Sequence, residues 1–230
     1  MSYEKIIQHT LTGILFDYWI WFYRSKWKFD KKEPKFFYIT GSTGVGFAKD
    51  QEVNINAAYQ STFGTKVLDE FDPGLNFELG VGYDFGSIRL EGTFTQGDNY
   101  MSKASSKTLD RYTEWADGTI TTKYYSLGLY FDFKQRGKFT PYVGGGLGNS
   151  TLTSVKVREK WNYRDNVGNV NDSFTQNSYF AKVGVSYEIN KKSDLFVEST
   201  YRVLNDINRT VGHYPSPTSY SVNLGVRYKI

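Results

Sequence analysis

A histidine with serine and aspartate neighbours near the C-terminal end is the first candidate for catalytic chemistry. The chain has two histidines, His9 and His213, and Asp206, Ser216 and Ser219 lie close to His213 in sequence. A hydrolase of the serine type needs a nucleophilic hydroxyl, a histidine base and an acid that orients the base. No acid follows at a suitable spacing on the last predicted strand. We therefore predict no catalytic residue and no enzyme, and keep a lipid-modifying enzyme that uses His213 as a remote alternative.

An acidic group is the second candidate. Asp69, Glu70 and Asp72 could offer carboxylate oxygens to Ca²⁺. They lack the alternating ligand spacing and the glycine of a dedicated calcium loop, which favours a solvated acidic tip. The chain contains no cysteine, so it has neither a disulfide nor a thiolate metal site. The sequence thus predicts no metal and no cofactor.

Charged residues on alternate positions of apolar segments are the third candidate. Six of them are predicted to face one another in an ion network: Glu91, Glu198, Arg202, Arg89, Glu188 and Lys182. Isolated buried ions are very unfavourable, so such charges either pair into a plug or contact water in a pore. Whether these charges form a plug or line a pore depends on the secondary-structure elements that carry them.

The stretch 123–150 shows what these elements are. Apolar residues occupy alternate positions on both sides of a short basic turn at 134–138, which is the pattern of a strand with one apolar and one polar face. Each arm has ten residues or more, about twice the length of an ordinary strand. Strands of about 9–11 residues with this alternation are what a tilted strand needs to cross a bilayer.

The same pattern recurs until eight strands can be counted. They cover 36–48, 74–85, 87–97, the two arms of 123–150, 177–189, 194–204 and 219–230. The connections alternate between short turns and four long loops at 49–73, 98–120, 154–176 and 205–218. This alternation is typical of outer-membrane barrels, which have short periplasmic turns and long external loops. The fold class is therefore all-β: an eight-stranded antiparallel up-and-down transmembrane β-barrel over 36–230.

Aromatic residues on the apolar faces support a membrane-spanning barrel. With the strand directions given by the loop lengths, they fall into an outer and an inner ring with aliphatic residues between them, as interfacial girdles do. A soluble barrel, with its apolar face turned inward, stays open as an alternative. The predicted girdle residues are Phe47, Phe77, Tyr125, Tyr179 and Tyr220 in the outer ring and Phe133, Tyr187 and Tyr228 in the inner ring.

The first 35 residues differ from the rest. Apolar residues from Ile7 to Phe22 recur at helical spacing, and a basic stretch follows at 24–35. The segment 1–35 is thus predicted to be helical or export-signal-like. Three readings stay open: a degenerate export signal, an interfacial amphipathic helix with a basic flank, or a plain N-terminal helix.

Four segments carry a family resemblance: GLNFELGVGYDFGSIRLEGTF, TPYVGGGLG, YFAKVGVSYEI and SVNLGVRYKI. In order and spacing, 36–230 resembles the small outer-membrane β-barrel superfamily of surface antigens, opacity proteins and OmpA-like porins. The resemblance implies the outer membrane of a Gram-negative bacterium. It also implies contact with outer-membrane lipid, lipopolysaccharide and the barrel insertion machinery.

The charge distribution limits the remaining partners. The net charge is +4, and no strand face is basic with interleaved exposed aromatics, so nucleic-acid binding is not expected. The four long loops are polar and aromatic, and loops on a rigid barrel are where binding occurs. We expect a non-enzymatic surface protein, structural or adhesive, that contacts a host or extracellular ligand through these loops. Because an eight-stranded barrel is just filled by side chains, an ion-paired plug is favoured over the alternative of a narrow porin for small solutes.

Overall fold

The fold is given by a computed structural model that describes residues 35–134, 137–163 and 168–230, with the backbone alone for 155–157 and 168–172. The helix expected within 1–35 lies outside these residues. The described residues form twelve strands and two short helical turns: β1 (Phe36–Ala48), β2 (Gln51–Ile55), η1 (Ala57–Tyr59), α2 (Gln60–Phe63), β3 (Lys66–Asp72), β4 (Gly74–Asp84), β5 (Ile88–Ser106), β6 (Thr113–Asp132), β7 (Phe139–Trp161), β8 (Gly168–Asn190), β9 (Ser193–Leu204), β10 (Ile207–Asn208), β11 (Gly212–Tyr214) and β12 (Thr218–Lys229). None of the helices in the described part of the chain has the length and apolar character needed to cross a membrane.

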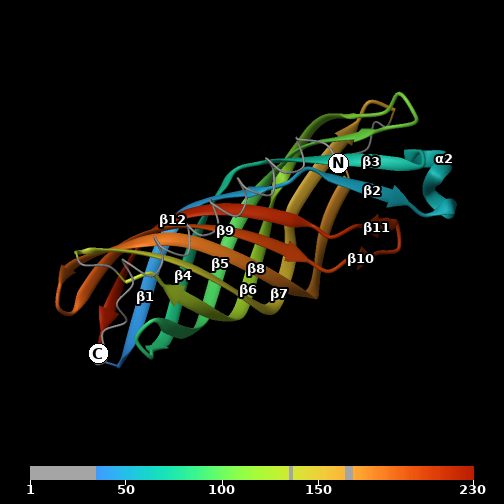
Figure 1. Cartoon of the computed structure of the whole chain (residues 1–230). Helices are drawn as coiled ribbons and strands as arrows, with labels where there is room; N and C mark the ends of the chain where they lie inside the picture. Colours follow the sequence, from blue (N-terminus) through green and yellow to red (C-terminus); the bar gives the residue numbers. More distant parts are fainter. Residues whose placement is uncertain (1–34, 135–136, 164–167) are drawn as a thin grey trace, which may run out of the picture.

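Eight of these strands close into a ring (Figure 1). Its order is β1–β4–β5–β6–β7–β8–β9–β12, and every neighbouring pair is antiparallel. The first and last strands close it, with a ladder that runs from Tyr38 opposite Lys229 to Ala48 opposite Ser219. The eight-stranded antiparallel barrel predicted from the sequence is confirmed. Closure leaves the ring without an open edge, which is what a lipid environment requires.

The prediction of long loops at 98–120 and 154–176 is wrong, because most of their residues lie in strands. β5 continues to Ser106 and β6 begins at Thr113, so that only 107–112 separate them. β7 and β8 likewise extend through most of 154–176. The apolar alternation used to find strands stops at the membrane boundary, where the outward face no longer meets lipid. A polar strand outside the bilayer therefore carries no such pattern.

The remaining two predicted loops, 49–73 and 205–218, also contain strands. The β2–β3 hairpin continues the β1–β4 pair, and β10–β11 continues the β9–β12 pair. β3 pairs with the outer half of β5, and β11 pairs with β2. We call the described residues of 49–73, 98–120, 154–176 and 205–218 the outer extension. It prolongs the cylinder beyond the ring at the end opposite the C-terminus (Figure 1).

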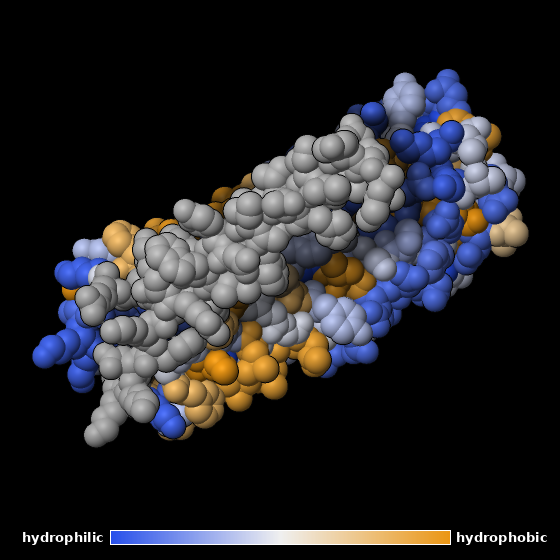
Figure 2. Space-filling model, in the orientation of Figure 1, coloured by the Kyte–Doolittle hydropathy of each residue, from blue (hydrophilic) through white to orange (hydrophobic). Residues whose placement is uncertain are grey.

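The outer surface of the ring is an apolar belt. Large apolar side chains on alternate positions of all eight strands are exposed, including Leu75 at 71%, Leu129 at 60% and Leu147 at 62%. Figure 2 shows hydrophobic residues along the visible side of the ring, whereas hydrophilic residues predominate at the outer extension, with some hydrophobic patches among them. Exposed apolar surface on every strand of a closed sheet is stable only against lipid. A soluble barrel with its apolar face turned inward is therefore excluded.

Inside the barrel, tyrosine side chains pack against glycine residues and fill the interior. Tyr38, Tyr130 and Tyr142 are at most 3% exposed. A Cβ atom added to Gly144 would lie 2.2 Å from the Tyr130 ring, and one added to Gly184 would lie 2.4 Å from the Tyr142 ring. Both distances are shorter than any real carbon–carbon contact. The glycines on the polar face thus provide the space that the tyrosine rings occupy.

Candidate functional site

The predicted girdle residues lie at the two ends of the apolar belt. Phe47, Phe77, Tyr125, Tyr179 and Tyr220 are between 40% and 57% exposed on the outward face. Neighbouring rings are in contact, as in Tyr201–Tyr220, whose centroids are 5.0 Å apart.

At the inner end, Tyr187 packs against Phe139 with the ring centroids 4.8 Å apart, and Tyr228 is exposed. Phe133 follows the last residue of β6, is half-buried, and contacts Phe131 edge to face.

Lys182 is the centre of the charged interior. Its Nζ lies 2.6 Å from Glu78 Oε1 and 2.8 Å from Glu198 Oε1. Glu78 also accepts a hydrogen bond from the Thr95 hydroxyl at 2.7 Å, and Glu198 accepts one from the Tyr142 hydroxyl at 2.8 Å. Glu78 on β4 and Lys182 on β8 stand four strands apart in the ring of eight, so this ion pair crosses the lumen. It ties opposite walls of the barrel together.

A second cluster lies nearer the inner end. Arg89 is 1% exposed, and its Nε donates to both carboxylate oxygens of Asp132, at 2.8 and 3.0 Å. Its Nη1 lies 3.6 Å from Glu91. The guanidinium also stacks on Tyr130 and Tyr142, at 4.9 Å from each ring centroid. Arg89 is thus paired with two carboxylates, as a plug requires, although its Nη2 is buried without a hydrogen-bond partner among the described residues.

Two of the six predicted network residues are not placed as expected. Glu188 shares the inward parity of Lys182 but is exposed, because it lies at the inner rim where a bulge interrupts the ladder between β8 and β9. It is outside the network. Arg202 is 4% exposed but makes no ion pair with Glu198, Glu91 or Glu188 within the described residues. Its guanidinium stacks on Tyr124 at 3.8 Å and donates to the Ser126 hydroxyl at 3.2 Å.

The sequence reasoning missed the partners that complete the network. Glu78 and Asp132 carry the shortest ion pairs to Lys182 and Arg89, and Tyr142 binds Glu198. Both acids were visible on the polar face of their strands. Which acid lies level with which base depends on the stagger of the ladder, and the residue pattern does not encode it.

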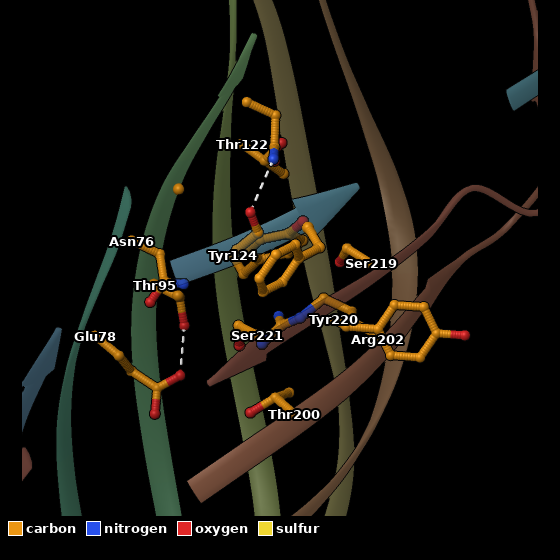
Figure 3. Close-up of a pocket in the computed structure, with 14 residues that line it drawn as sticks. Asn76, Glu78, Thr95, Thr122, Tyr124, Thr200, Arg202, Ser219, Tyr220 and Ser221 are labelled. Atoms are coloured by element: carbon orange, nitrogen blue, oxygen red, sulfur yellow. Dashed lines mark hydrogen bonds between the residues drawn. The ribbon is translucent and has the colours of Figure 1, made fainter. Parts of the chain in front are cut away.

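A small chamber opens at the outer end of the lumen. Its volume is about 40 Å³. Figure 3 shows Arg202 reaching into it beside Tyr124, with Glu78 and Thr95 on the other side. A space of this size holds water or a small ion, since one water needs roughly 10–15 Å³ on this measure. The chamber separates the charged interior from the outer extension.

The outer extension has a hydrophobic core of its own. Val53, Ile55, Val67, Ala104 and Trp161 are at most 6% exposed and pack together. Five partly buried side chains surround them: Tyr59, Phe63, Met101, Tyr163 and Tyr214. The core draws on all four stretches of the outer extension, so these stretches form one packed body.

Asp69 is an acidic group of the outer extension whose pKa is raised strongly. Burial, with the negative charge of Glu159 nearby, raises the pKa of Asp69 to about 7. Asp69, Glu70 and Asp72 follow one another along β3. In the described part of the chain, no three histidine, aspartate or glutamate side chains are grouped so that they could hold a metal ion.

His213, Asp206 and Ser216 lie close together, but their arrangement differs from that of a serine hydrolase. Ser216 donates to Asp206 Oδ1 from its hydroxyl at 2.7 Å and from its backbone N–H at 2.8 Å. These hydrogen bonds lower the pKa of Asp206. His213 Nε2 lies 3.6 Å from the same carboxylate, and its Nδ1 is 2.8 Å from Asn208. Serine and histidine thus both face the aspartate, whereas a nucleophile needs its hydroxyl on the histidine.

A closed antiparallel ring with a lipid-facing apolar belt, two aromatic girdles and a charged interior defines an outer-membrane β-barrel protein. Residues 28–229 match the model of the outer membrane protein beta-barrel domain family, and the chain belongs to this family. It is a protein of the outer membrane of a Gram-negative bacterium.

Solved structures show the same fold. The Neisserial surface protein A structure matches with a TM-score of 0.56 and 16% identity, over 86% of this chain and 100% of that one. The outer membrane protein OprG of Pseudomonas aeruginosa matches with a TM-score of 0.54 and 15% identity, over 86% and 98%. A search of curated proteins finds no significant sequence match.

Proposed function

We propose that the protein is a non-enzymatic, non-conducting surface barrel that binds an extracellular partner through its outer extension. The observation that carries the proposal is the double closure of the lumen. Lys182 bridges Glu78 and Glu198 across the ring, and a second packed cluster, the core around Trp161, lies in the outer extension beyond it. A solute would have to break both to pass. The alternative of a narrow porin needs both to open together.

The outer extension suits binding because its shape is fixed before a partner arrives. Strand ladders and a core hold it, so little conformational freedom is lost on association. Its surface keeps several large apolar and aromatic side chains exposed by 37% to 50%: Tyr100, Leu109, Tyr112, Trp115 and Val211. Exposed aromatic side chains on a rigid frame are the residues that contribute most at protein interfaces. A host or extracellular ligand is the partner that this surface fits.

The belt and girdles support the remaining partners that we propose. Aromatic rings at both ends would contact the headgroup regions, with lipopolysaccharide in the outer leaflet. Delivery into that membrane would use the barrel insertion machinery.

Adhesion by whole cells tests the proposal. Cells that display the protein are expected to adhere to host cells or an extracellular surface more strongly than cells that lack it. Replacing Leu109, Tyr112 and Trp115 by serine should reduce adhesion strongly without loss of the folded barrel, as judged by its heat-dependent gel mobility. The matched control replaces Lys134 and Lys138 at the opposite end by serine. Adhesion that is unchanged in the first variant would contradict the assignment.

A tag experiment checks the orientation on which the proposal depends. An epitope within 107–112 should bind antibody on intact cells, and one within 134–138 should bind only after the outer membrane is opened. The reverse result would turn the outer extension towards the periplasm and remove the proposed binding role.

A further inference from the structure

The chamber at the outer end of the lumen is lined by two charged side chains, Arg202 and Glu78. They are not equally satisfied. Both carboxylate oxygens of Glu78 are engaged, one by Lys182 and the other by Thr95. Arg202 has five N–H donors, and the hydrogen bond to Ser126 is the one that the described residues provide with a side-chain acceptor. A buried guanidinium without a contacting anion is electrostatically unfavourable.

Polar groups beside Arg202 point to a missing ligand. Asn76 is 6% exposed and lines the chamber, yet neither its amide nitrogen nor its amide oxygen has a hydrogen-bond partner. The hydroxyl of Thr200, at 5% exposure, also lines the chamber and has no partner. Buried polar atoms in native proteins are nearly always paired, so among the described residues the Asn76 amide nitrogen and the Thr200 hydroxyl are donors without an acceptor, and the Asn76 amide oxygen is an acceptor without a donor. Figure 3 shows them around one space, with Asn76 from β4, and Thr200 and Arg202 from β9.

We propose that this chamber is a binding site for one small monovalent anion of halide size. The Arg202 guanidinium supplies the charge, and the Asn76 amide N–H and the Thr200 hydroxyl supply neutral donors. Tyr124, stacked on the guanidinium at 3.8 Å, holds its plane in place. A volume of about 40 Å³ admits a halide ion.

Electrostatics decide where in the chamber the anion sits. Lys182 is shared between Glu78 and Glu198, so these three groups together carry one net negative charge, which Arg202 balances at longer range. An anion in contact with Glu78 would be repelled. It therefore binds on the Arg202 side, and its affinity is modest, in the range where the salt of the surroundings fills the site.

Bromide diffraction tests the position directly. Crystals of the full chain soaked in sodium bromide should show an anomalous peak within hydrogen-bond distance of the Arg202 guanidinium and the Asn76 amide. No peak at this place, with Arg202 ordered, would show that the chamber holds water alone and would overturn the proposal.

Thermal unfolding in detergent micelles tests it in solution. At constant ionic strength, replacing gluconate by chloride should raise the melting temperature by a few degrees, because a ligand that binds the folded state stabilises it. Asn76→Asp places a fixed carboxylate where the anion binds, and should abolish this chloride-dependent shift. The same change at Asn54→Asp, in the outer extension, should leave the shift intact.

A second variant keeps the test decisive if Asn76→Asp does not fold. Thr200→Val removes a donor at constant shape and should reduce the chloride-dependent shift. Equal melting temperatures in chloride and gluconate for the unmodified protein, or the same chloride response in all variants, would contradict an anion site at Arg202.

Discussion

The ring and the outer extension are built from the same strands but are inverted with respect to each other. In the ring, leucine and valine face outward, and arginine, lysine and glutamate fill the interior. In the outer extension, Val53, Val67 and Trp161 are buried in a core, and the visible outside is predominantly hydrophilic (Figure 2). β5, β6, β7 and β8 pass through both regions without a break. The inversion therefore follows the solvent that surrounds each region rather than the secondary structure.

The inversion determines what holds each region together. Lipid contributes no hydrophobic force towards the interior of the ring, so cross-lumen ion pairs, tyrosine packing and closed ladders must stabilise it. The outer extension stands in water and is stabilised by burial of an ordinary apolar core. The same kind of substitution should therefore have different effects on stability in the ring and in the outer extension.

The largest effect is expected from Lys182→Met. This change leaves Glu78 and Glu198 facing each other in the lumen without their shared cation, and breaking a buried ion pair in this way costs about 3–5 kcal/mol. Urea titration of the protein in lipid vesicles measures it. Adding Glu78→Gln and Glu198→Gln to the same chain should restore most of the free energy of unfolding. A neutral Lys182→Met would mean that the lumen is hydrated and open.

A charge on the outward face should separate the two regions next. Leu129→Arg places a cation against the bilayer core and should lower the free energy of unfolding by about 2–4 kcal/mol. Val211→Arg, at a residue of the outer extension that is 39% exposed, is the matched control and should be close to neutral, since it faces water. Equal losses from the two variants would contradict the boundary drawn between the regions.

Truncation of the outer core should loosen that region alone. Val53→Ala removes two methyl groups from the cluster around Trp161 and should cost about 2 kcal/mol, from lost burial and the cavity left behind. Hydrogen exchange should quicken at the amides of β2, β3 and the outer half of β7. Amides of the ring, such as those of β1 and β12, should keep their protection. Faster exchange throughout would show that the regions unfold as one.

Within a single pH unit, the smallest effect is that of pH on the outer extension. Because the pKa of Asp69 is about 7 in the folded protein and near 3.8 otherwise, folding binds a proton between these values. The stabilisation is complete below about pH 4 and is lost as the pH rises to about 7, at no more than about 1.4 kcal/mol per pH unit. Asp69→Asn should flatten this slope in unfolding titrations. Asp117→Asn, at an exposed position of β6, should leave the slope unchanged.

The sequence predicted the ring far better than the outer extension, for a physical reason. Apolar alternation marks a strand only where one face meets lipid and the other does not, so β1 was located to the residue and β4, β9 and β12 within one residue at either end. In the outer extension, Thr- and Ser-rich strands replace that pattern, and 98–120 and 154–176 were predicted as loops. The polar composition of these stretches was therefore wrongly interpreted as a sign of irregular loops.

For the candidate site residues, the sequence predicted which face of a strand each side chain lies on, but not which residue it pairs with. Arg89, Glu91, Lys182, Glu198 and Arg202 lie inside the ring, because alternate residues of a strand share a face. Lys182 bridges two acids, while Arg202 stacks on Tyr124, and neither outcome follows from spacing along one strand. Contacts across the lumen depend on strand stagger, which only the three-dimensional ladder defines.

The closed lumen is the central claim, and single-channel recording of the refolded full chain in planar bilayers tests it most directly. The ion pairs of Lys182 and the apolar core around Trp161 predict no steady current at any applied voltage within the stability of the bilayer. Removing the bridge with Lys182→Met should produce at most brief openings, since the outer core still closes the cylinder. A steady, ion-selective current from the unmodified protein would contradict the account and establish a pore.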